Sequence, residues 1–272
     1  MKTFEQRVHE ESKGDRFAYD AVQRLTGVKM NVPEAELPNA DTVEFEKSWN
    51  AQYDKVDNIL NLVKTNDENT QQILTTIDTD QAKLNQYTTF DQWALTYDQN
   101  GNMTEKGGQR FTYDYRDQLV EATEDDTTLT FKYDPLGRRV RKTESWPNNN
   151  KTTNYFYSGN RVIEERDGDD LVQKQYVYGN GIDELEAIIV PDHENEVENF
   201  YYVHRNAIGS VTAITDANGD ILERVTYDVF GMPTFTDGNG AQLMSSVIGN
   251  DILFQGRRYD KETNLYYYRA RY

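Results

Sequence analysis

The side chains that could take part in nucleophilic or metal chemistry include three histidines, His9, His193 and His204, and no cysteine. Nucleophilic catalysis needs a hydroxyl or thiol beside a base, and a zinc site needs clustered ligands. The three histidines lie far apart in unrelated contexts, so the sequence indicates neither arrangement. We interpret His204, in Tyr202-Val203-His204-Arg205, as a packed or hydrogen-bonded structural residue rather than a general base.

Carboxylates are plentiful, but they lie where turns are expected. Asp216-Ala217-Asn218-Gly219-Asp220 places oxygen atoms at alternate positions, loosely like a calcium loop, and Asp98-Gln99-Asn100-Gly101-Asn102 is similar. The first stretch lacks the sixth-position glycine and the closing glutamate of an EF-hand. We interpret both as turn-forming residues. No glycine-rich phosphate loop precedes a helix either. Together with the scattered histidines and the turn-forming carboxylates, this predicts no metal, no cofactor and no enzymatic activity.

The clearest element around these carboxylates is a strand–turn–strand motif at residues 129–143. Leu129, Phe131 and Tyr133 alternate with polar residues, which is typical of a half-buried strand. In the turn, Asp134 can accept backbone hydrogen bonds, and Gly137 can adopt the positive φ that closes it. The basic run at residues 138–142 follows. We interpret this run as a solvated strand, polar on both faces, and not as a phosphate-binding surface.

The Tyr-Asp dipeptide of this motif recurs along the chain. It occurs at residues 19, 53, 97, 113, 133, 227 and 259, and weaker copies surround Tyr157 and Tyr178. A period near 20 residues with one turn per copy predicts two short strands per repeat, stacked into one meandering antiparallel sheet. The repeat residues, which we interpret as structural, are Tyr19, Asp20, Tyr97, Asp98, Gly101, Tyr113, Asp114, Tyr133, Asp134, Gly137, His204, Gly209, Tyr227, Asp228, Gly231, Gly256, Tyr259 and Asp260.

The composition fits a sheet whose burial relies on aromatic side chains. Only 36% of the 272 residues are hydrophobic, but 19 are tyrosine. We expect the tyrosine rings to stack on equivalent rings in neighbouring strands. The formal charge of −18 argues against nucleic-acid partners, since phosphate binding needs clustered cations. No apolar run is long enough to span a membrane, and the N-terminus does not resemble a signal peptide.

The region before residue 93 is less regular. Pro33 and Pro38 predict a loop near residues 31–42. Residues 43–84 fit either amphipathic helices or strands, and we favour strands because the flanking repeats supply partners. We therefore divide the chain into degenerate repeats at 1–92, a repeat sheet at 93–199 and a closing region at 200–272.

Two stretches carry a resemblance to a known family. Residues 200–231, with Phe200-Tyr201-Tyr202-Val203-His204-Arg205-Asn206, and residues 252–272, with Phe254-Gln255-Gly256-Arg257-Arg258-Tyr259-Asp260, resemble the two ends of the core region of YD-repeat, or Rhs-repeat, proteins. The resemblance implies an all-β fold, in which a meandering sheet of YD hairpins curls into a shell sealed by the core. In bacterial members such a shell commonly encloses a C-terminal toxin, and teneurins use it for adhesion.

Some features depart from the family pattern. Asn206 replaces the usual aspartate after the histidine, and Asn264 replaces a turn glycine. The Asp-Pro-rich segment used for self-cleavage by some toxin members would follow Tyr272, so its aspartates are absent from this chain. We expect a partial shell, because the repeats are too few for a complete one.

The expected function is that of a non-enzymatic shell scaffold belonging to a larger secreted or cell-surface protein. It would enclose or present a toxin or effector segment that this chain lacks, and its partners would be that polypeptide or further repeats. The alternative is a cell-surface adhesion module, or a carbohydrate- or protein-binding module, that uses the tyrosine-rich face.

Overall fold

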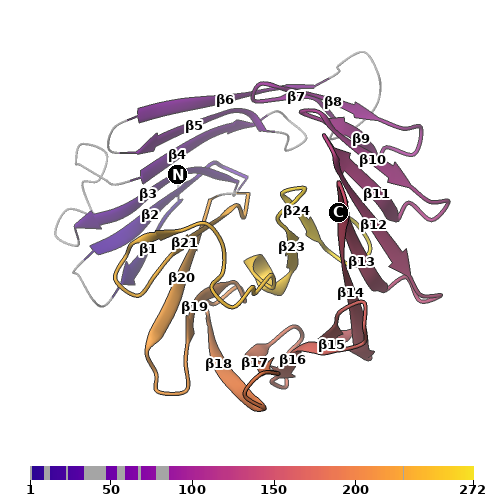
Figure 1. The fold of residues 1–272 in the computed structure, drawn as a ribbon. Helices are drawn as coiled ribbons and strands as arrows, with labels where there is room; N and C mark the ends of the chain where they lie inside the picture. The colour runs from indigo at the N-terminus through magenta and orange to yellow at the C-terminus, as the bar shows by residue number, and fades with distance from the viewer. Residues whose placement is uncertain are drawn as a thin grey trace. The chain divides into compact units, whose positions relative to one another are not determined.

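The computed structural model describes residues 2–8, 13–22, 24–33, 47–53, 59–66, 69–77, 86–228 and 230–272. The chain divides into two compact units, Met1–Gly108 and Gln109–Tyr272 (Figure 1). The three segments expected from the sequence, with boundaries at residues 92 and 199, stay a prediction. Within the described residues, no helix is long and apolar enough to cross a membrane.

The first unit is an antiparallel meander in which each strand pairs with the next. Its strands are β1 (Lys2–Val8), β2 (Lys13–Tyr19), β3 (Leu25–Pro33), β4 (Lys47–Tyr53), β5 (Ile59–Asn66), β6 (Asn69–Ile77), β7 (Tyr87–Phe90), β8 (Trp93–Tyr97) and β9 (Met103–Lys106). The strand prediction for residues 43–84 is thus confirmed over β4 to β6. In the expected loop near 31–42, residues 31–33 belong to β3, and 34–42 lie outside the described residues.

The second unit continues the same pattern in a longer meander of consecutive antiparallel pairs. The strands are β10 (Gln109–Tyr113), β11 (Leu119–Glu124), β12 (Thr127–Tyr133), β13 (Arg139–Trp146), β14 (Asn149–Ser158), β15 (Arg161–Arg166), β16 (Val172–Tyr178), β17 (Leu185–Asp192), β18 (Val197–Arg205), β19 (Val211–Thr215), β20 (Ile221–Tyr227), β21 (Pro233–Thr236) and β22 (Gln242–Leu243). The predicted all-β meander is confirmed.

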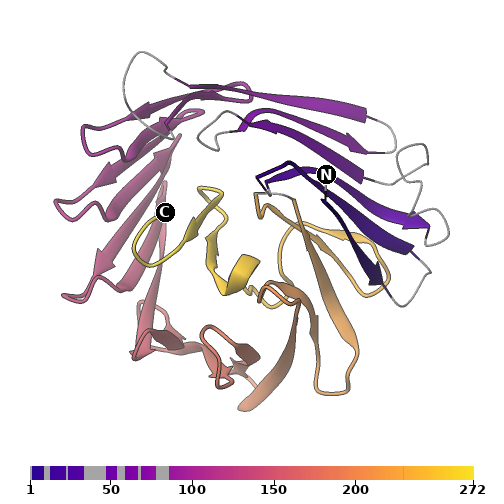
Figure 2. The same cartoon turned by 180° about the vertical axis from the view of Figure 1, so that it is seen from behind.

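A separate hairpin follows this meander. It comprises a 3₁₀ turn, η2 (Phe254–Gly256), and strands β23 (Arg258–Asp260) and β24 (Leu265–Tyr267). We call β10–β22 the wall and residues 252–272 the cap. Figures 1 and 2 show the cap, in yellow, inside the curve of the wall strands. Ile252 and Leu253 of the cap join the hydrophobic clusters of the wall's inner face.

The hairpin turns of the wall follow from local sequence. Asp134 Oδ1 accepts hydrogen bonds from the backbone N–H groups of Leu136 and Arg138, both at 2.9 Å. The N–H of Gly137 donates to the Asp134 carbonyl at 2.9 Å, and Gly137 has a φ of 82°. This conformation costs a residue with a Cβ more than it costs glycine. Aspartate and glycine at this spacing therefore determine where the strands reverse.

Tyrosines connect successive repeats through their hydroxyl groups. The Tyr133 hydroxyl donates to the Leu119 carbonyl at 2.7 Å, and Leu119 lies five residues after the turn aspartate of the preceding repeat. The equivalent bonds are Tyr53 to Leu25, Tyr157 to Arg139 and Tyr227 to Val211, at 2.6 to 2.8 Å. Each bond supplies a phenol donor to a backbone carbonyl, and so links one hairpin to the next.

The rings of these tyrosines do not follow the expected stacking at the positions where their contacts are resolved. The Arg138 guanidinium lies 4.8 Å from the Tyr157 ring centre, and Arg161 lies 5.4 Å from that of Tyr178. Tyr133 contacts Tyr267 of the cap instead. The reason is geometric, because equivalent tyrosines lie two strands apart, roughly 10 Å at ordinary strand spacing.

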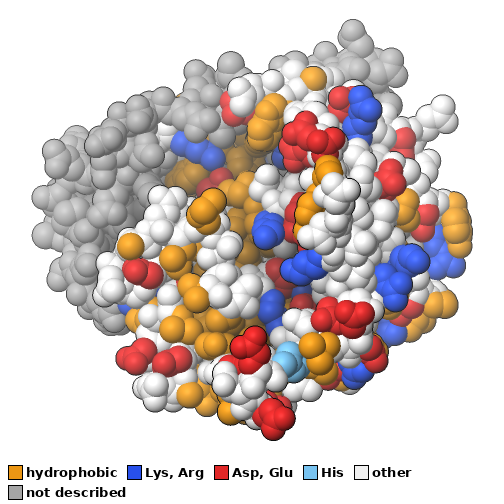
Figure 3. Space-filling model, in the orientation of Figure 1, with side chains coloured by type: hydrophobic (Ala, Val, Ile, Leu, Met, Phe, Trp, Pro, Cys, Tyr) orange, Lys and Arg blue, Asp and Glu red, His pale blue; other side chains and the backbone are white. Residues whose placement is uncertain are grey.

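The interpretation of residues 138–142 as a solvated strand was wrong. Arg139 is 1% exposed and Lys142 is 8% exposed, and both face the cap. Lys142 pairs in register with Phe131, which is itself buried, so its side chain lies on the inner face. Elsewhere on the visible side of the wall, acidic and basic side chains are interspersed over the turns of β10 to β14 (Figure 3).

Candidate functional site

The junction between wall and cap contains five of the buried charged residues that the structure describes, namely Arg139, Lys142, Glu165, Arg258 and Asp260. Arg139 of β13 donates from Nη1 to Asp260 Oδ2 of β23 at 2.5 Å and also to the Tyr272 hydroxyl. Its backbone N–H donates to the Tyr267 hydroxyl at 3.0 Å. The rings of Tyr267 and Tyr155 flank the guanidinium at 4.7 and 5.3 Å. The wall thus binds the cap through a charge enclosed by aromatic rings.

Lys142 extends this network along the same strand. Its Nζ lies 2.6 Å from Glu262 Oε2, 3.3 Å from Asp260 Oδ1 and 3.6 Å from Glu144 Oε1. Two of these carboxylates belong to the cap and one to the wall. Arg139 and Lys142 together therefore fix the position of β23 against β13.

A second ionic contact runs in the opposite direction, with the cation on the cap. Arg258 is 6% exposed and donates to Glu165 of β15 and, at 2.6 Å, to Asp251. The Tyr176 hydroxyl donates to the same Glu165 oxygen at 2.6 Å. At one place the wall supplies the cations and the cap the carboxylates, and at the other place the roles are reversed. This arrangement favours one position of the cap along the wall. We call the contacts of Arg139, Lys142 and Arg258 the ionic anchor.

The pKa values show that these groups stay ionised. Burial by itself would raise the pKa of Asp260, but Arg139 and Lys142 outweigh it and lower the pKa from 3.8 to about 2. Burial opposes ionisation of Glu165 too, and Arg258 is the main group that lowers its pKa from 4.5 to about 2. Burial opposes the charge on Arg139, but Asp260 raises its pKa well above the ordinary value. The anchor is therefore a set of compensated charges.

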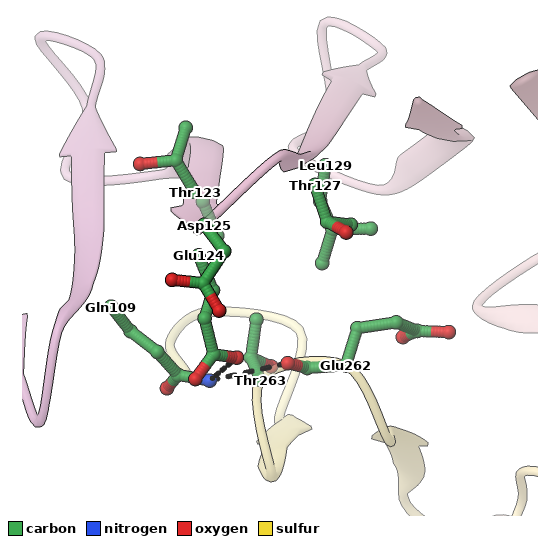
Figure 4. Close-up of a pocket in the computed structure, with 9 residues that line it drawn as sticks. Gln109, Thr123, Glu124, Asp125, Thr127, Leu129, Glu262 and Thr263 are labelled. Atoms are coloured by element: carbon green, nitrogen blue, oxygen red, sulfur yellow. Dashed lines mark hydrogen bonds between the residues drawn. The ribbon is translucent and has the colours of Figure 1, made fainter. Parts of the chain in front are cut away.

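Two cavities lie beside the anchor. One, of about 290 Å³, is lined by Gln109, Glu124 and Leu129 of the wall and Thr263 of the cap (Figure 4). Gln109 Nε2 donates to Glu124 Oε2 at 2.9 Å and to the Glu262 carbonyl at 3.2 Å, so it forms one more wall–cap bond.

The other cavity, of about 560 Å³, lies between cap and wall. It is polar, and its lining includes Lys142, Glu144, Glu165, Lys174, Lys261 and Glu262. Burial raises the pKa of Glu144, and the neighbouring Glu262 adds to this effect while Lys142 opposes it. The inner face of the wall thus borders a cavity that can hold water and is lined by charges of both signs.

Most of the repeat residues expected from the sequence lie at turns along the sheet and do not meet in one site. Asp20, Asp98, Asp114 and Asp228 accept the same pair of backbone N–H groups as Asp134. The turn residues Gly101, Gly209 and Gly231 have positive φ. Tyr19, Tyr97, Tyr113 and Tyr227 are the final residues of β2, β8, β10 and β20.

Asn206 shows how a departure from the motif is accommodated, and His204 lies two residues before it. Asn206 Oδ1 accepts from the N–H groups of Ile208 and Ser210 at 3.1 and 3.0 Å, as the turn aspartates do. His204 is exposed on β18, with its Nε2 3.1 Å from the Thr215 hydroxyl. Asp216 likewise accepts from the N–H groups of Asn218 and Asp220, at 2.9 Å each.

Gly256, Tyr259 and Asp260 belong to the cap and not to the wall turns. Gly256 has a φ of 67°, and a Cβ there would lie 3.1 Å from the Asp183 carbonyl oxygen. The Tyr259 hydroxyl donates to Asn264 Oδ1 at 2.6 Å. Asp260 is the centre of the anchor. The sequence thus named one anchor residue, without its partners.

The anchor cations Arg139, Lys142 and Arg258 were missed. The available signal was the register, because Lys142 and Glu144 lie opposite the buried Phe131 and Leu129 of β12. Charges opposite a buried apolar strand need partners from another element.

The family profile described as teneurin YD-shell matches residues 4–271. The chain belongs to this family. The match confirms the resemblance that the repeats and core motifs indicated, and the YD-shell chain has the scaffold fold of this family.

Similar proteins extend this finding. A Bacillus spizizenii protein named tRNA3(Ser)-specific nuclease WapA is 38% identical over 194 residues, and Bacillus subtilis (strain 168) tRNA nuclease WapA is 36% identical over 194 residues. Each match covers 70% of the YD-shell chain and 8% of the relative. The crystal structure of TcdB2-TccC3 without its hypervariable C-terminal region superposes with a TM-score of 0.68. That match has 16% identity and covers 94% of this chain and 13% of the other, which shows the shared fold.

The prediction that the chain is not an enzyme was wrong in the light of these relatives. Proteins that are 36–38% identical to it are named as tRNA nucleases, which are enzymes. The composition and motifs of this chain did not by themselves indicate a relationship to nucleases.

Proposed function

We propose that this YD-shell chain is a wall-and-cap segment of a shell that encloses or presents an effector polypeptide. The effector would be supplied by a longer protein that contains the chain, or by another chain. We also propose that the protein acts at the cell surface or after secretion, and this part of the proposal rests on the family resemblance.

The ionic anchor is the observation that carries this proposal. A sheet that needed only to be a flat scaffold would require no buried charges on one face, because burying ions is costly unless they are fully paired. Here Arg139, Lys142 and Arg258 fix an internal hairpin against the inner face. The cap thereby covers part of the inner face, and polar cavities lie beside it.

The names of the relatives supply the second support. Two are named as tRNA nucleases, and the similar crystal structure is described by the removal of a hypervariable C-terminal region. The chain spans 8% of the length of those nucleases, so their activity is a property of the whole proteins. An effector carried by such a protein is therefore the class of cargo that we propose.

The test is a protection experiment. The natural protein that contains this chain would be purified together with the effector segment encoded by the same gene, and then treated with a nonspecific protease. We expect the effector to be digested at least ten times more slowly than when it is isolated. Asp260→Asn would abolish this protection, and Asp134→Asn, in an ordinary wall turn, would preserve it. Equal digestion of isolated and shell-associated effector would refute the proposal.

A further inference from the structure

A small cavity at the wall–cap junction is lined by five arginines. They are Arg138 and Arg161 of the wall and Arg257, Arg258 and Arg269 of the cap. Asp183 is the one carboxylate among the lining residues, and the cavity volume is about 60 Å³. Such a concentration of cations is unexpected in a chain with a formal charge of −18. We call these five residues the arginine cluster.

On the wall side, Arg161 is not neutralised by an ion pair. Its Nη1 and Nη2 donate to the backbone carbonyls of Gly179 and Gly181, at 3.1 and 2.6 Å. Within the part of the chain that the structure describes, Arg161 forms no salt bridge. Arg138 differs, because its guanidinium lies 2.6 Å from the Asp134 carboxylate. Arg161 thus lines the cavity without a direct ion pair, although the charge of Glu184 lies close enough to interact with it.

On the cap side, two arginines share one carboxylate. Arg257 Nη1 lies 2.9 Å from Asp183 Oδ2, and Arg269 pairs with Asp183 Oδ1. The single negative charge of Asp183 cannot balance both guanidinium groups. Asp183 therefore serves two guanidinium groups at once, whereas Arg258 is paired with Glu165 and Asp251.

Some donor groups of the cluster lack acceptors altogether. Arg257 Nε and Arg258 Nη2 are buried and have no hydrogen-bond partner among the described residues. Arg258 as a whole is 94% buried, being 6% exposed. Buried donors are normally paired, and an unpaired guanidinium N–H is especially unfavourable. The missing group at this place is a hydrogen-bond acceptor, and a charged oxygen is the strongest acceptor for a guanidinium N–H.

We propose that the arginine cluster binds one small oxyanion, which bridges the wall and the cap. Guanidinium groups match the oxygen spacing of phosphate and carboxylate and bind both in forked pairs. A volume of about 60 Å³ accommodates a group of phosphate or carboxylate size and excludes a nucleotide. The bound oxyanion would supply the acceptors that Arg257 Nε and Arg258 Nη2 lack, and it would add a direct charged partner for Arg161. This inference is independent of the effector proposal.

The test is titration of the purified chain with sodium phosphate, followed by calorimetry and by thermal unfolding at constant ionic strength in sodium chloride. We expect saturable phosphate binding with one site per chain, and a rise in Tm that chloride does not reproduce. Arg161→Gln should weaken the binding at least tenfold. Arg116→Gln is the matched control, because Arg116 also donates to the carbonyl of a neighbouring turn, that of Pro135 at 3.2 Å, but does not line the cavity.

Two further arms sharpen the result. Sodium acetate in place of phosphate identifies the source of the oxyanion: tighter acetate binding indicates the carboxylate of a polypeptide, and tighter phosphate binding indicates free phosphate. Arg269→Gln, at a partly exposed cap position, tests the cap side even where Arg161→Gln destabilises the fold. Equal effects of phosphate, acetate and chloride, or equal phosphate affinity of Arg161→Gln and Arg116→Gln, would overturn the proposal.

Discussion

Tyr133-Asp134 in the wall and Tyr259-Asp260 in the cap are the same dipeptide in two different environments. The Asp134 side chain is 15% exposed and accepts backbone N–H groups of its own turn. The Asp260 side chain is 1% exposed and neutralises two cations of a distant strand. The comparison teaches that one copy of a repeat motif can determine local backbone shape, while another determines how two elements dock.

The largest expected effect comes from changing the two aspartates to asparagine. Asp260→Asn leaves the buried Arg139 without its carboxylate partner and removes one of the three carboxylates around Lys142, and breaking a buried pair costs about 3–5 kcal/mol. Asp134→Asn should cost less than about 1 kcal/mol, because Asn206 already forms the same turn and the ion pair with Arg138 is partly exposed. Urea denaturation measures both free energies of unfolding. Equal losses would remove the distinction between wall and cap aspartates.

The next largest expected effect is the pH dependence of stability that the buried carboxylates of the anchor produce. Asp260 and Glu165 have folded-state pKa values of about 2, below their ordinary values of 3.8 and 4.5, because paired cations outweigh burial. Because the pKa is lowered in the folded state, each ionised carboxylate stabilises the fold at pH values above its unfolded-state pKa. This contribution is lost as the pH falls towards the folded-state pKa of about 2.

We therefore expect the urea midpoint of the second unit to be steady near neutral pH and to fall below about pH 4. In Asp260→Asn the fall should be shallower, because one of the two carboxylates no longer takes up a proton. Parallel curves for wild type and variant would show that Asp260 does not titrate as part of the anchor.

The tyrosine hydroxyls give an intermediate effect. Tyr267→Phe removes the acceptor of the buried Arg139 N–H, and an unsatisfied buried donor costs about 1–3 kcal/mol. Tyr133→Phe removes one donor to the Leu119 carbonyl and should cost about 1 kcal/mol. Hydrogen exchange at the Arg139 amide should accelerate in the first variant and stay unchanged in the second. The reverse order of effects would show that the repeat ladder, and not the anchor, limits stability.

The last comparison concerns one glycine of the wall and one of the cap. Gly137→Ala should cost about 1 kcal/mol, since its φ is 82° and the added methyl would lie 3.2 Å from the side-chain nitrogen of Gln118 and contact no backbone atom. Gly256→Ala should cost more, because its methyl would press on the backbone carbonyl oxygen of Asp183 at 3.1 Å. Thermal unfolding of the two variants compares them directly, and a larger loss for Gly137→Ala would contradict the assignment of Gly256 to a tight wall–cap contact.

The sequence by itself determined the features that depend on residues close together in the chain. The turn of Asp134 uses N–H groups two and four residues ahead, so its aspartate and glycine spacing could be recognised directly. The repetition of that spacing predicted an antiparallel meander, including strands β4 to β6, where helices were the alternative.

Only the tertiary structure decided the role of the charges. Arg139 and Asp260 lie 121 residues apart, and neither residue type is ordinarily buried without a partner. Read locally, residues 138–142 are therefore a polar strand, and Tyr259-Asp260 is another copy of the repeat. Burial of the cap against the wall converts the first into a cation pair and the second into its counterion, because a charge removed from water must find its opposite nearby.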